Sequence, residues 1–338
     1  MASIPTVEIG VPGDKVRVPR IGLGTMGMSA VFGPTNDDES IKVLERAIDI
    51  GCTFWNTACA YGIGHNERLL SRVLKDRRDK VFVSTKFGIM LREPEDDPPK
   101  FFAHYMIGHN GKRDYVRECI NKTLERLGTD YVDLYIIARI DRSTPLEETI
   151  GALGELVKEG KIRYIGISEC TADDLRRAYK VHPIAAAEVE YSVWSRDIEA
   201  DGLLDACRDL GVTIIAYSPL GHGFLTGRVR NTDELDKDDV RSNLDRLQPE
   251  HFDANLRFVD SFGRLAKKHN ATAGQLALAW LLRQEENLIA IPGTKKIKYL
   301  EENFGAGQIE LSDAELKELR NVVNNADIQG HRLWKEHS

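Results

Sequence analysis

Lys86 and Tyr61 are the residues whose types and positions in the sequence best suit chemistry. Lys86 ends the apolar run VFVSTK, where a buried ammonium group is costly unless it has a partner. Either the amine escapes to solvent at the end of this run, or it is a positive charge held beside a reacting group. A cationic lysine near Tyr61 would lower the pKa of the phenol from about 10 toward neutrality. Such a tyrosine can donate a proton to a carbonyl oxygen.

The elements that must position these two residues alternate along the 338-residue chain. Eight short apolar runs predict strands at residues 21–24, 53–57, 81–86, 131–137, 162–168, 185–189, 212–217 and 288–291. Amphipathic stretches predict helices at residues 38–50, 66–76, 113–127, 147–159, 172–180, 198–210, 253–269 and 296–304. Continuous apolar strands separated by helices indicate a parallel sheet that is covered on both faces. Eight such units in roughly 290 residues favour a closed (β/α)8 TIM barrel over the alternative, an open doubly wound sheet.

Several segments lie outside this repeat. Residues 6–9 and 16–19, separated by a Pro-Gly-Asp turn, predict an N-terminal β-hairpin that could plug the bottom of the barrel. Extra C-terminal helices are predicted at residues 272–285, capped by Thr272, and at residues 312–325, capped by Ser312 with Glu315 three residues on. Long loops at residues 88–112 and 220–252 follow strands, which predicts that they lie on the C-terminal face. Barrel enzymes carry their reactive groups on that face. No linker is evident, so residues 1–338 are expected to form a single barrel domain.

The composition limits the classes of function. The net charge of -7 argues against a generally basic nucleic-acid-binding surface. The five cysteines are odd in number and form no CxxC pair, which favours a reduced, cytoplasmic setting over a disulfide framework or a zinc site. The first residues show no secretion signal, and no stretch of about 18 apolar residues predicts a membrane span. Neither a nucleic acid nor a membrane is therefore expected as a partner.

The ordered set of motifs resembles a known family. The segments GLGTMGMS, NTACAYG, STKFG, RLGTDYVDLY, GISEC, VEYS, AYSPLG and IPGTKKIKYLEEN occur in the order and spacing of the aldo-keto reductases, from about residue 17 to residue 325. Within that family, the chain is most similar to the branch of pyridoxal reductases and voltage-channel β-subunits. The resemblance implies a (β/α)8 barrel that transfers hydride between NADPH and an aldehyde or ketone.

The resemblance also implies an active site of four residues, two of which are substituted here. Tyr61 matches the family's proton donor and Lys86 matches the lysine that lowers its pKa. Asn56 stands where the family has an aspartate paired with the lysine, and it cannot give Lys86 a negative partner. Ala138 stands where the family has a histidine that orients the carbonyl group. Losing such a donor typically costs on the order of 10²–10³ in rate.

These substitutions leave several interpretations open. The chain could be an NADPH-dependent reductase of a carbonyl or conjugated substrate, either weakened or with altered chemistry. It could instead be a non-redox enzyme, or an NADP-binding protein with little turnover, on the same scaffold. An engineered variant of an ordinary active site is a further alternative. We expect an NADP-dependent oxidoreductase of the aldo-keto reductase type.

The cofactor positions implied by the resemblance are better kept, although no GxGxxG motif follows a strand in the Rossmann context. Gly24, Thr25 and Met26 are expected under the nicotinamide ribose. Ser168, Glu169 and Glu188 are expected near the carboxamide, and Tyr217 is expected to stack on the nicotinamide or, alternatively, to pack at the end of its strand. The pyrophosphate is expected along Ser218, Leu220, Gly221 and Gly223. Glu188 stands where glutamine is common, so it can accept a hydrogen bond from the carboxamide but cannot donate one.

A basic cluster supports NADP(H) over NAD(H). Thr294, Lys295, Lys296 and Lys298 surround the predicted start of a helix in an otherwise acidic protein. Positive charges oppose the dipole at a helix N-terminus, whereas a bound phosphate there would be favoured. The 2′-phosphate of NADP is the natural candidate, and a solvated basic turn is the alternative. Glu302 and Asn303 match the family's adenine contacts.

Apolar side chains near the predicted strand ends could form a substrate wall. The candidates are Met28, Trp55, Phe87, Phe101, Phe102, Tyr105, Met106 and Trp194. Core packing is an equal alternative for Trp55. His222 could bind phosphate or reach the pocket as a substitute acid.

Overall fold

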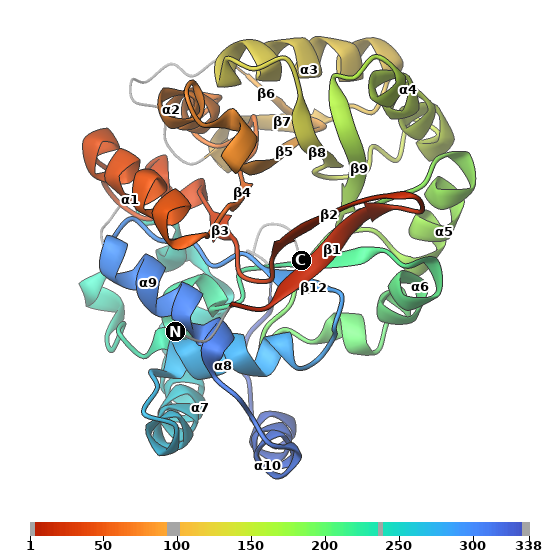
Figure 1. Ribbon diagram of the computed structural model, residues 1–338. Coiled ribbons are helices and arrows are strands. Elements are labelled where there is room, and N and C mark those ends of the chain that lie inside the picture. Colours follow the sequence, from red (N-terminus) through yellow and green to blue (C-terminus); the bar gives the residue numbers. More distant parts are fainter. Residues whose placement is uncertain (1–3, 93–101, 236–238, 333–338) are drawn as a thin grey trace.

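The chain folds around a sheet of eight parallel strands, as the computed structural model shows for residues 4–92, 102–235 and 239–332 (Figure 1). All eight predicted strands are present, and their ends are shifted by no more than two residues. In spatial order they are β3 (Leu23–Gly24), β4 (Phe54–Asn56), β5 (Phe82–Phe87), β8 (Val132–Ile137), β9 (Ile162–Ser168), β10 (Ala186–Glu190), β11 (Thr213–Tyr217) and β12 (Leu288–Ala290).

The first and last of these strands meet, which confirms the closed barrel over the open sheet. Parallel bridges join Ile21 to Ala290 and Gly24 to Gly293. The approach of the two chains is close, because a Cβ atom at Gly24 would lie 2.8 Å from the carbonyl oxygen of Ile291. Glycine at this position therefore lets the barrel close beside the strand end where the family's cofactor is expected.

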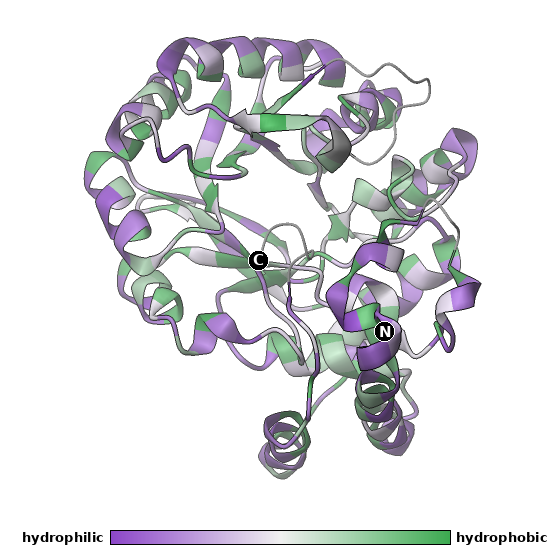
Figure 2. Cartoon of the chain, turned by 180° about the vertical axis from the view of Figure 1, so that it is seen from behind, coloured by the Kyte–Doolittle hydropathy of each residue, from purple (hydrophilic) through white to green (hydrophobic). Residues whose placement is uncertain are grey.

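Helices cover the outside of the barrel (Figure 1). They are α1 (Asp37–Ile50), α2 (His65–Leu74), α3 (Arg113–Leu127), α4 (Leu146–Lys158), α5 (Ala172–Val181), α6 (Leu203–Leu210), α7 (Pro249–Lys268), α8 (Ala273–Leu282), α9 (Ile297–Gly305) and α10 (Asp313–Asn324). Their outward faces are hydrophilic and the strands are mostly hydrophobic (Figure 2). The caps predicted at Thr272 and Ser312 are both present, and each belongs to a capping box, with Gln275 and Glu315 three residues on.

One predicted helix is shorter than expected. Residues 198–210 do not form a continuous helix, because a single turn at Asp197–Glu199 is separated from α6. Gly202 precedes α6 with φ +82°, a left-handed conformation that interrupts a right-handed helix. Helical periodicity alone did not indicate this break.

The N-terminal hairpin is formed by β1 (Thr6–Val11) and β2 (Asp14–Pro19), as predicted. Its strands cross one end of the barrel in Figure 1. Ile9 and Val18 are buried in one cluster with Phe54, Phe82 and Tyr164 of the barrel strands. The hairpin therefore plugs the N-terminal end of the barrel and leaves the other end for a site.

The two long loops contain more local structure than the sequence indicated. The loop after β5 forms an antiparallel hairpin of β6 (Ile89–Leu91) and β7 (Met106–His109). The loop after β11 is built of short 3-10 turns that begin with Gly221–Thr226. Both loops follow barrel strands, so they lie on the C-terminal side, as predicted.

Among the described residues, no helix combines the length and apolarity that crossing a membrane requires. Within the same part of the chain, histidine, cysteine, aspartate and glutamate side chains form no group of three or more that could hold a metal ion.

Candidate active site at the C-terminal strand ends

Asn56, Lys86 and Glu188 meet inside the barrel near the carboxyl ends of β4, β5 and β10. Successive side chains of a strand point to opposite faces. Phe82 of β5 belongs to the barrel interior, so Lys86, four residues on, points inward as well. Lys86 is only 5% exposed. The alternative in which its amine escapes to solvent is therefore wrong.

The ammonium group of Lys86 lies beside the Tyr61 phenol. Its Nζ atom is 3.2 Å from the Tyr61 hydroxyl oxygen and 5.1 Å from the centre of the ring. Nζ also donates to the carbonyl oxygen of Thr57 at 3.0 Å. The backbone N–H of Cys59 donates to the carbonyl oxygen of Lys86 at 3.2 Å, which ties the loop that carries Tyr61 to β5. The two residues singled out from the sequence are thus brought together.

Lys86 also has a negative partner, although Asn56 cannot provide one. The Glu188 carboxylate lies 3.2 Å from Nζ across the barrel. Burial alone would lower the pKa of Lys86, but the Glu188 charge, followed by Tyr61, outweighs burial and raises that pKa above its usual value. The ammonium form is therefore the form that the site stabilises.

Asn56 connects the cation and the carboxylate. Its Oδ1 accepts from Lys86 Nζ at 2.5 Å, and its Nδ2 donates to Glu188 Oε2 at 2.8 Å and to Ser84 Oγ at 3.3 Å. The amide orientation is set by its neighbours, since the lysine can only donate and the carboxylate can only accept. Asn56 thus keeps a hydrogen bond to Lys86 without carrying charge.

Ala138 follows β8 and presents no donor to this side of the site. It is buried, and its backbone N–H donates to the carbonyl oxygen of Phe87 at 2.8 Å. The neighbouring Arg139 places Nη1 2.7 Å from the carbonyl oxygen of Ala138 and 3.5 Å from Ser168 Oγ. A cation therefore lies one residue beyond the position where the resemblance implies a histidine.

The expected carboxamide and nicotinamide positions form a second polar group. The Tyr217 hydroxyl donates to Glu169 Oε1 at 2.9 Å, and Glu169 has φ +52°, a conformation that non-glycine residues rarely adopt. Arg332 Nη2 donates to Glu169 Oε2 at 2.8 Å. Burial would raise the pKa of Glu169, but Arg332 holds it below its usual value. Ser168 lies beside them and is buried.

Sequence reasoning missed Arg332, because no motif marks the tail that carries it. After α10 the tail returns across α7, where Asn255 exchanges hydrogen bonds of 2.9 and 3.0 Å with the backbone of Gln329. The backbone N–H of His331 then donates to Asp245 Oδ2 at 2.7 Å. These contacts position the guanidinium of Arg332 near the strand ends.

A buried asparagine, also missed, fixes the segment expected under the ribose. Thr25 lies one residue beyond Gly24, and its hydroxyl is 2.6 Å from Asn66 Oδ1. Asn66 Nδ2 donates to the carbonyl oxygen of Thr25 at 2.9 Å and to Ser29 Oγ at 2.8 Å. Met26 begins the 3-10 turn that follows. A polar residue at the start of α2, next to the Tyr-Gly motif, was the available signal.

The residues expected along the pyrophosphate form a tight turn after β11. Ser218, Gly221 and Gly223 all have positive φ. A Cβ atom at Gly221 would lie 2.6 Å from the Trp194 indole, so the backbone passes directly over that ring. Leu220 is buried. Desolvation, then Arg241, lowers the pKa of His222 to about 4, so its ring is neutral at pH 7 and poorly suited to be a cationic acid.

The basic cluster lies at the start of α9, as predicted. Lys296 is the N-cap residue and the first turn has no acidic residue. The Thr294 hydroxyl accepts from the backbone N–H of Lys296 at 3.1 Å. Lys295 Nζ donates to the carbonyl oxygens of Phe32 and Pro34 at 2.8 and 3.0 Å, so it also fastens the loop after β3. Lys298 is exposed one residue into the helix.

The positions matched to adenine lie one turn further along α9. Glu302 accepts from Arg228 Nη2 at 2.8 Å and from the Thr272 hydroxyl at 2.9 Å, and Asn303 is buried. The Arg228 guanidinium lies 3.5 Å from the centre of the Tyr299 ring. These side chains place an ordered charged surface beside the basic cluster.

Much of the predicted substrate wall belongs to the core instead. Trp55 and Phe87 are fully buried on the helix-facing side of the sheet, where Trp55 donates to the carbonyl oxygen of Cys52 and Phe87 stacks on Tyr135. Strand alternation explains this, since Asn56 and Lys86 take the inward positions. Met28 is fully buried, and Trp194 stacks on Phe224 with ring centres 5.3 Å apart. Phe101 lies outside the described residues.

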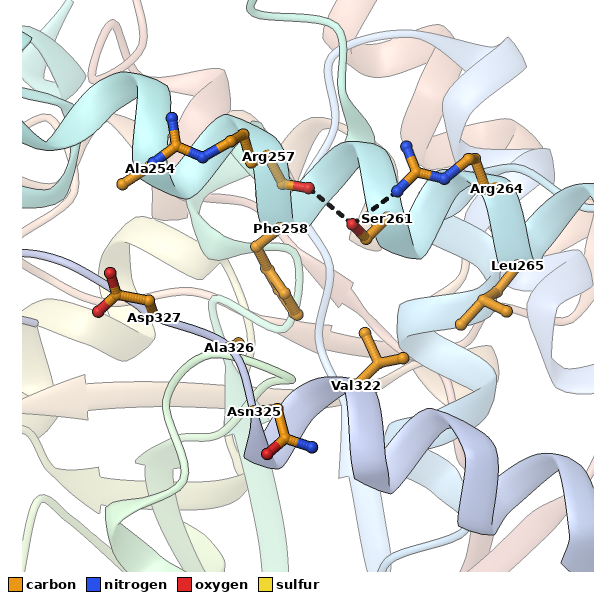
Figure 3. Close-up of a pocket in the computed structure, with 10 residues that line it drawn as sticks. All are labelled: Ala254, Arg257, Phe258, Ser261, Arg264, Leu265, Val322, Asn325, Ala326 and Asp327. Carbon is orange, nitrogen blue, oxygen red and sulfur yellow. Dashed lines mark hydrogen bonds between the residues drawn. The ribbon is translucent and has the colours of Figure 1, made fainter.

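A cavity of about 510 Å³ lies away from the strand ends, between α7 and the end of α10 (Figure 3). Its lining includes Phe258, Val322 and Arg264, which donates to Ser261 Oγ at 2.9 Å. None of the predicted site residues lines it, so it is separate from the candidate active site.

The closed eight-stranded barrel, with a lysine and a tyrosine paired at its C-terminal end, defines a class of barrel oxidoreductases. The aldo/keto reductase family model matches residues 20–324, and the chain belongs to that family. It is 44% identical to the aldo-keto reductase yakc of Schizosaccharomyces pombe, whose name specifies NADP(+), over 98% of this chain and 94% of that protein.

Solved structures agree with this assignment. A glycerol dehydrogenase from Gluconobacter oxydans matches with a TM-score of 0.84 and 27% identity, covering 95% of this chain and 96% of that one. An aldo/keto reductase from Klebsiella pneumoniae, solved with NADP and acetate, matches with a TM-score of 0.72 and 27% identity. The match covers 97% of this chain and 99% of that one.

Proposed function

We propose that the protein is an NADPH-dependent reductase of small carbonyl or conjugated substrates, with Tyr61 as the proton donor. The observation that carries this proposal is the 3.2 Å approach of the buried Lys86 ammonium to the Tyr61 hydroxyl at the strand ends. The relative from Schizosaccharomyces pombe bears the name of an NADP(+) enzyme, and the Klebsiella pneumoniae structure contains NADP.

The residues at the expected cofactor positions are suited to bind NADPH. Lys296 and Lys298 bring positive charge to a helix N-terminus that has no acidic residue in its first turn, which suits the 2′-phosphate of NADP. The positive-φ turn after β11 would hold the pyrophosphate with Ser218, Gly221 and Gly223. Ser168, Glu169 and Tyr217 would border the nicotinamide. When bound, NADPH supplies the hydride that the carbonyl carbon accepts.

The protein's own residues would then manage the proton and the charge. As the carbonyl oxygen gains negative charge, it takes the proton of the Tyr61 hydroxyl, and a phenolate is left behind. The Lys86 ammonium stabilises that phenolate at hydrogen-bond distance. General acid catalysis of this kind contributes about 10²–10⁴-fold to a rate. Solvent can return the proton to Tyr61, which is half-buried.

Single-turnover kinetics test this function. NADPH-loaded protein is mixed with a panel of aldehydes, ketones and enones, and NADPH oxidation is followed by stopped-flow absorbance. Tyr61→Phe, which removes only the hydroxyl, should slow the reaction by about 10²-fold or more and leave the NADPH dissociation constant unchanged. If no compound in the panel oxidises NADPH, the protein is not a reductase of this type.

A second candidate is an NADP-binding protein with little turnover. The observation in its favour is Ala138, which offers no side-chain donor where the family places a histidine. The same experiment separates the two candidates, because this one predicts tight NADPH binding without oxidation by any compound in the panel.

A further inference from the structure

We propose that Glu188 is a positioning residue that supplies the counter-charge of Lys86, so that the carboxylate of the site stands on β10 rather than on β4. The proposal rests on the proposed function, because Lys86 matters through its effect on Tyr61. It gives Glu188 a role different from that of a contact to the nicotinamide carboxamide.

The contacts of Glu188 carry this proposal. One carboxylate oxygen lies 3.2 Å from Lys86 Nζ, and the other accepts from Asn56 Nδ2 at 2.8 Å. Both oxygens are therefore directed at the Lys86 side of the site. The ion pair is deeply buried, since the side chains of Lys86 and Glu188 are 6% and 3% exposed. A buried ammonium without a carboxylate would tend to lose its proton.

Asn56 supplies a neutral amide and Glu188 supplies a charged carboxylate, and both groups contact the Lys86 ammonium group. Asn56 donates to Glu188 and accepts from Lys86, so it bridges the two charges. A carboxylate at position 56 and an amide at position 188 would have the same net charge with the two roles exchanged. The charge can therefore be moved between the strands by two isosteric substitutions.

Few other charges face the Lys86 ammonium. Tyr61 and Cys59 come from the loop after β4, and Glu188 comes from β10. Burial raises the pKa of Cys59, which keeps its thiol neutral near pH 7. Glu188 is thus the carboxylate within ion-pair distance of Lys86 among the described residues.

Glu188→Gln removes the charge and keeps the shape. Without its carboxylate, Lys86 should have a folded-state pKa below the unfolded value of about 10.4. The destabilisation is then greatest below that folded-state pKa and is relieved as the pH rises toward 10.4. From pH 8 to 10, the urea midpoint of Glu188→Gln should rise relative to that of the wild type, in which the pair is intact.

The double variant Asn56→Asp with Glu188→Gln returns a carboxylate to β4. The difference between its urea midpoint and that of the wild type should stay constant from pH 8 to 10. Glu190→Gln is the matched control, because Glu190 lies two residues along the same strand and is buried without an ion pair to Lys86 among the described residues. The difference between the urea midpoint of Glu190→Gln and that of the wild type should also stay constant from pH 8 to 10.

Single-turnover NADPH oxidation and NADPH titration complete the test. Glu188→Gln should lower the turnover rate on the order of 10²-fold with little change in NADPH affinity, and the double variant should recover most of that rate. If Glu188→Gln mainly weakens NADPH binding, or if its midpoint runs parallel to the wild type, the proposal is overturned. Failure of the double variant to recover either property also overturns it.

The unfolding measurements need no turnover. If the wild type oxidises no NADPH, the proposed reductase function fails, while the pH dependence of the urea midpoint still decides whether Glu188 is the counter-charge of Lys86.

Discussion

The guanidinium of Arg332 forms an ion pair with Glu169 at 2.8 Å, and this pair ties the C-terminal tail to the strand ends where the nicotinamide is expected. Arg332 thus contacts the candidate site, although it lies 163 residues from Glu169 in the sequence. Arg332 Nη1 also lies 3.8 Å from Glu190 Oε2.

Arg332→Ala should destabilise the fold by about 2 kcal/mol at pH 7, because it leaves Glu169 largely buried without its ion-pair partner. Arg332 keeps the folded-state pKa of Glu169 below its unfolded value. The stabilisation is therefore present above about pH 4.3 and is lost as the pH falls through the folded-state pKa. Urea unfolding at pH 7 and at successively lower pH values, until the midpoint difference between the variant and the wild type disappears, measures this. Arg332→Lys, which keeps the charge, should lose less, and equal losses for both variants would show that charge is not the cause.

Glu190 should make the protein less stable as the pH rises through neutrality. Burial raises its pKa from 4.5 to about 7, so the folded protein holds this proton at a pH at which the unfolded chain has released it. The stability is lost between these two values, and Glu190→Gln should remove that loss. The variant should match the wild type near pH 4.5 and exceed it by up to about 3 kcal/mol above pH 7. A variant that is less stable than the wild type at pH 8 contradicts this account.

Local patterns predicted most of the fold, and the misses have physical reasons. Strands and capped helices were predicted because periodicity and capping boxes are local signals, whereas the break at Gly202 depends on one positive φ. Phe87 was assigned to the substrate wall although alternation from the inward Lys86 already directs it to the helices. The charge on Lys86 could not be predicted, because its partner Glu188 is more than a hundred residues away and the pairing depends on barrel geometry.

Lys296 should favour NADPH over NADH if the 2′-phosphate binds at the start of α9. Lys296→Ala should weaken NADPH binding by about 10-fold or more, since a charged hydrogen bond is worth about 1.5–3 kcal/mol, and should hardly change NADH binding. Lys296 is a cleaner probe than Lys295, which also holds the carbonyl oxygens of Phe32 and Pro34. Fluorescence titration measures both constants, with the exposed Lys317→Ala as the control for charge. Equal weakening of the two cofactors contradicts the phosphate assignment.

Ala138→His should increase ordinary carbonyl reduction. The substitution places a donor at the end of β8, where a developing oxyanion lacks one, and such a donor is typically worth on the order of 10²–10³ in rate. Because Glu188 already provides a carboxylate to Lys86, the gain should not require Asn56→Asp as well. Stopped-flow NADPH oxidation with one aldehyde compares the single variant, Asn56→Asp and the double variant. If Ala138→His gains rate only together with Asn56→Asp, then Glu188 does not replace a carboxylate at position 56, and the rate depends on charge at β4.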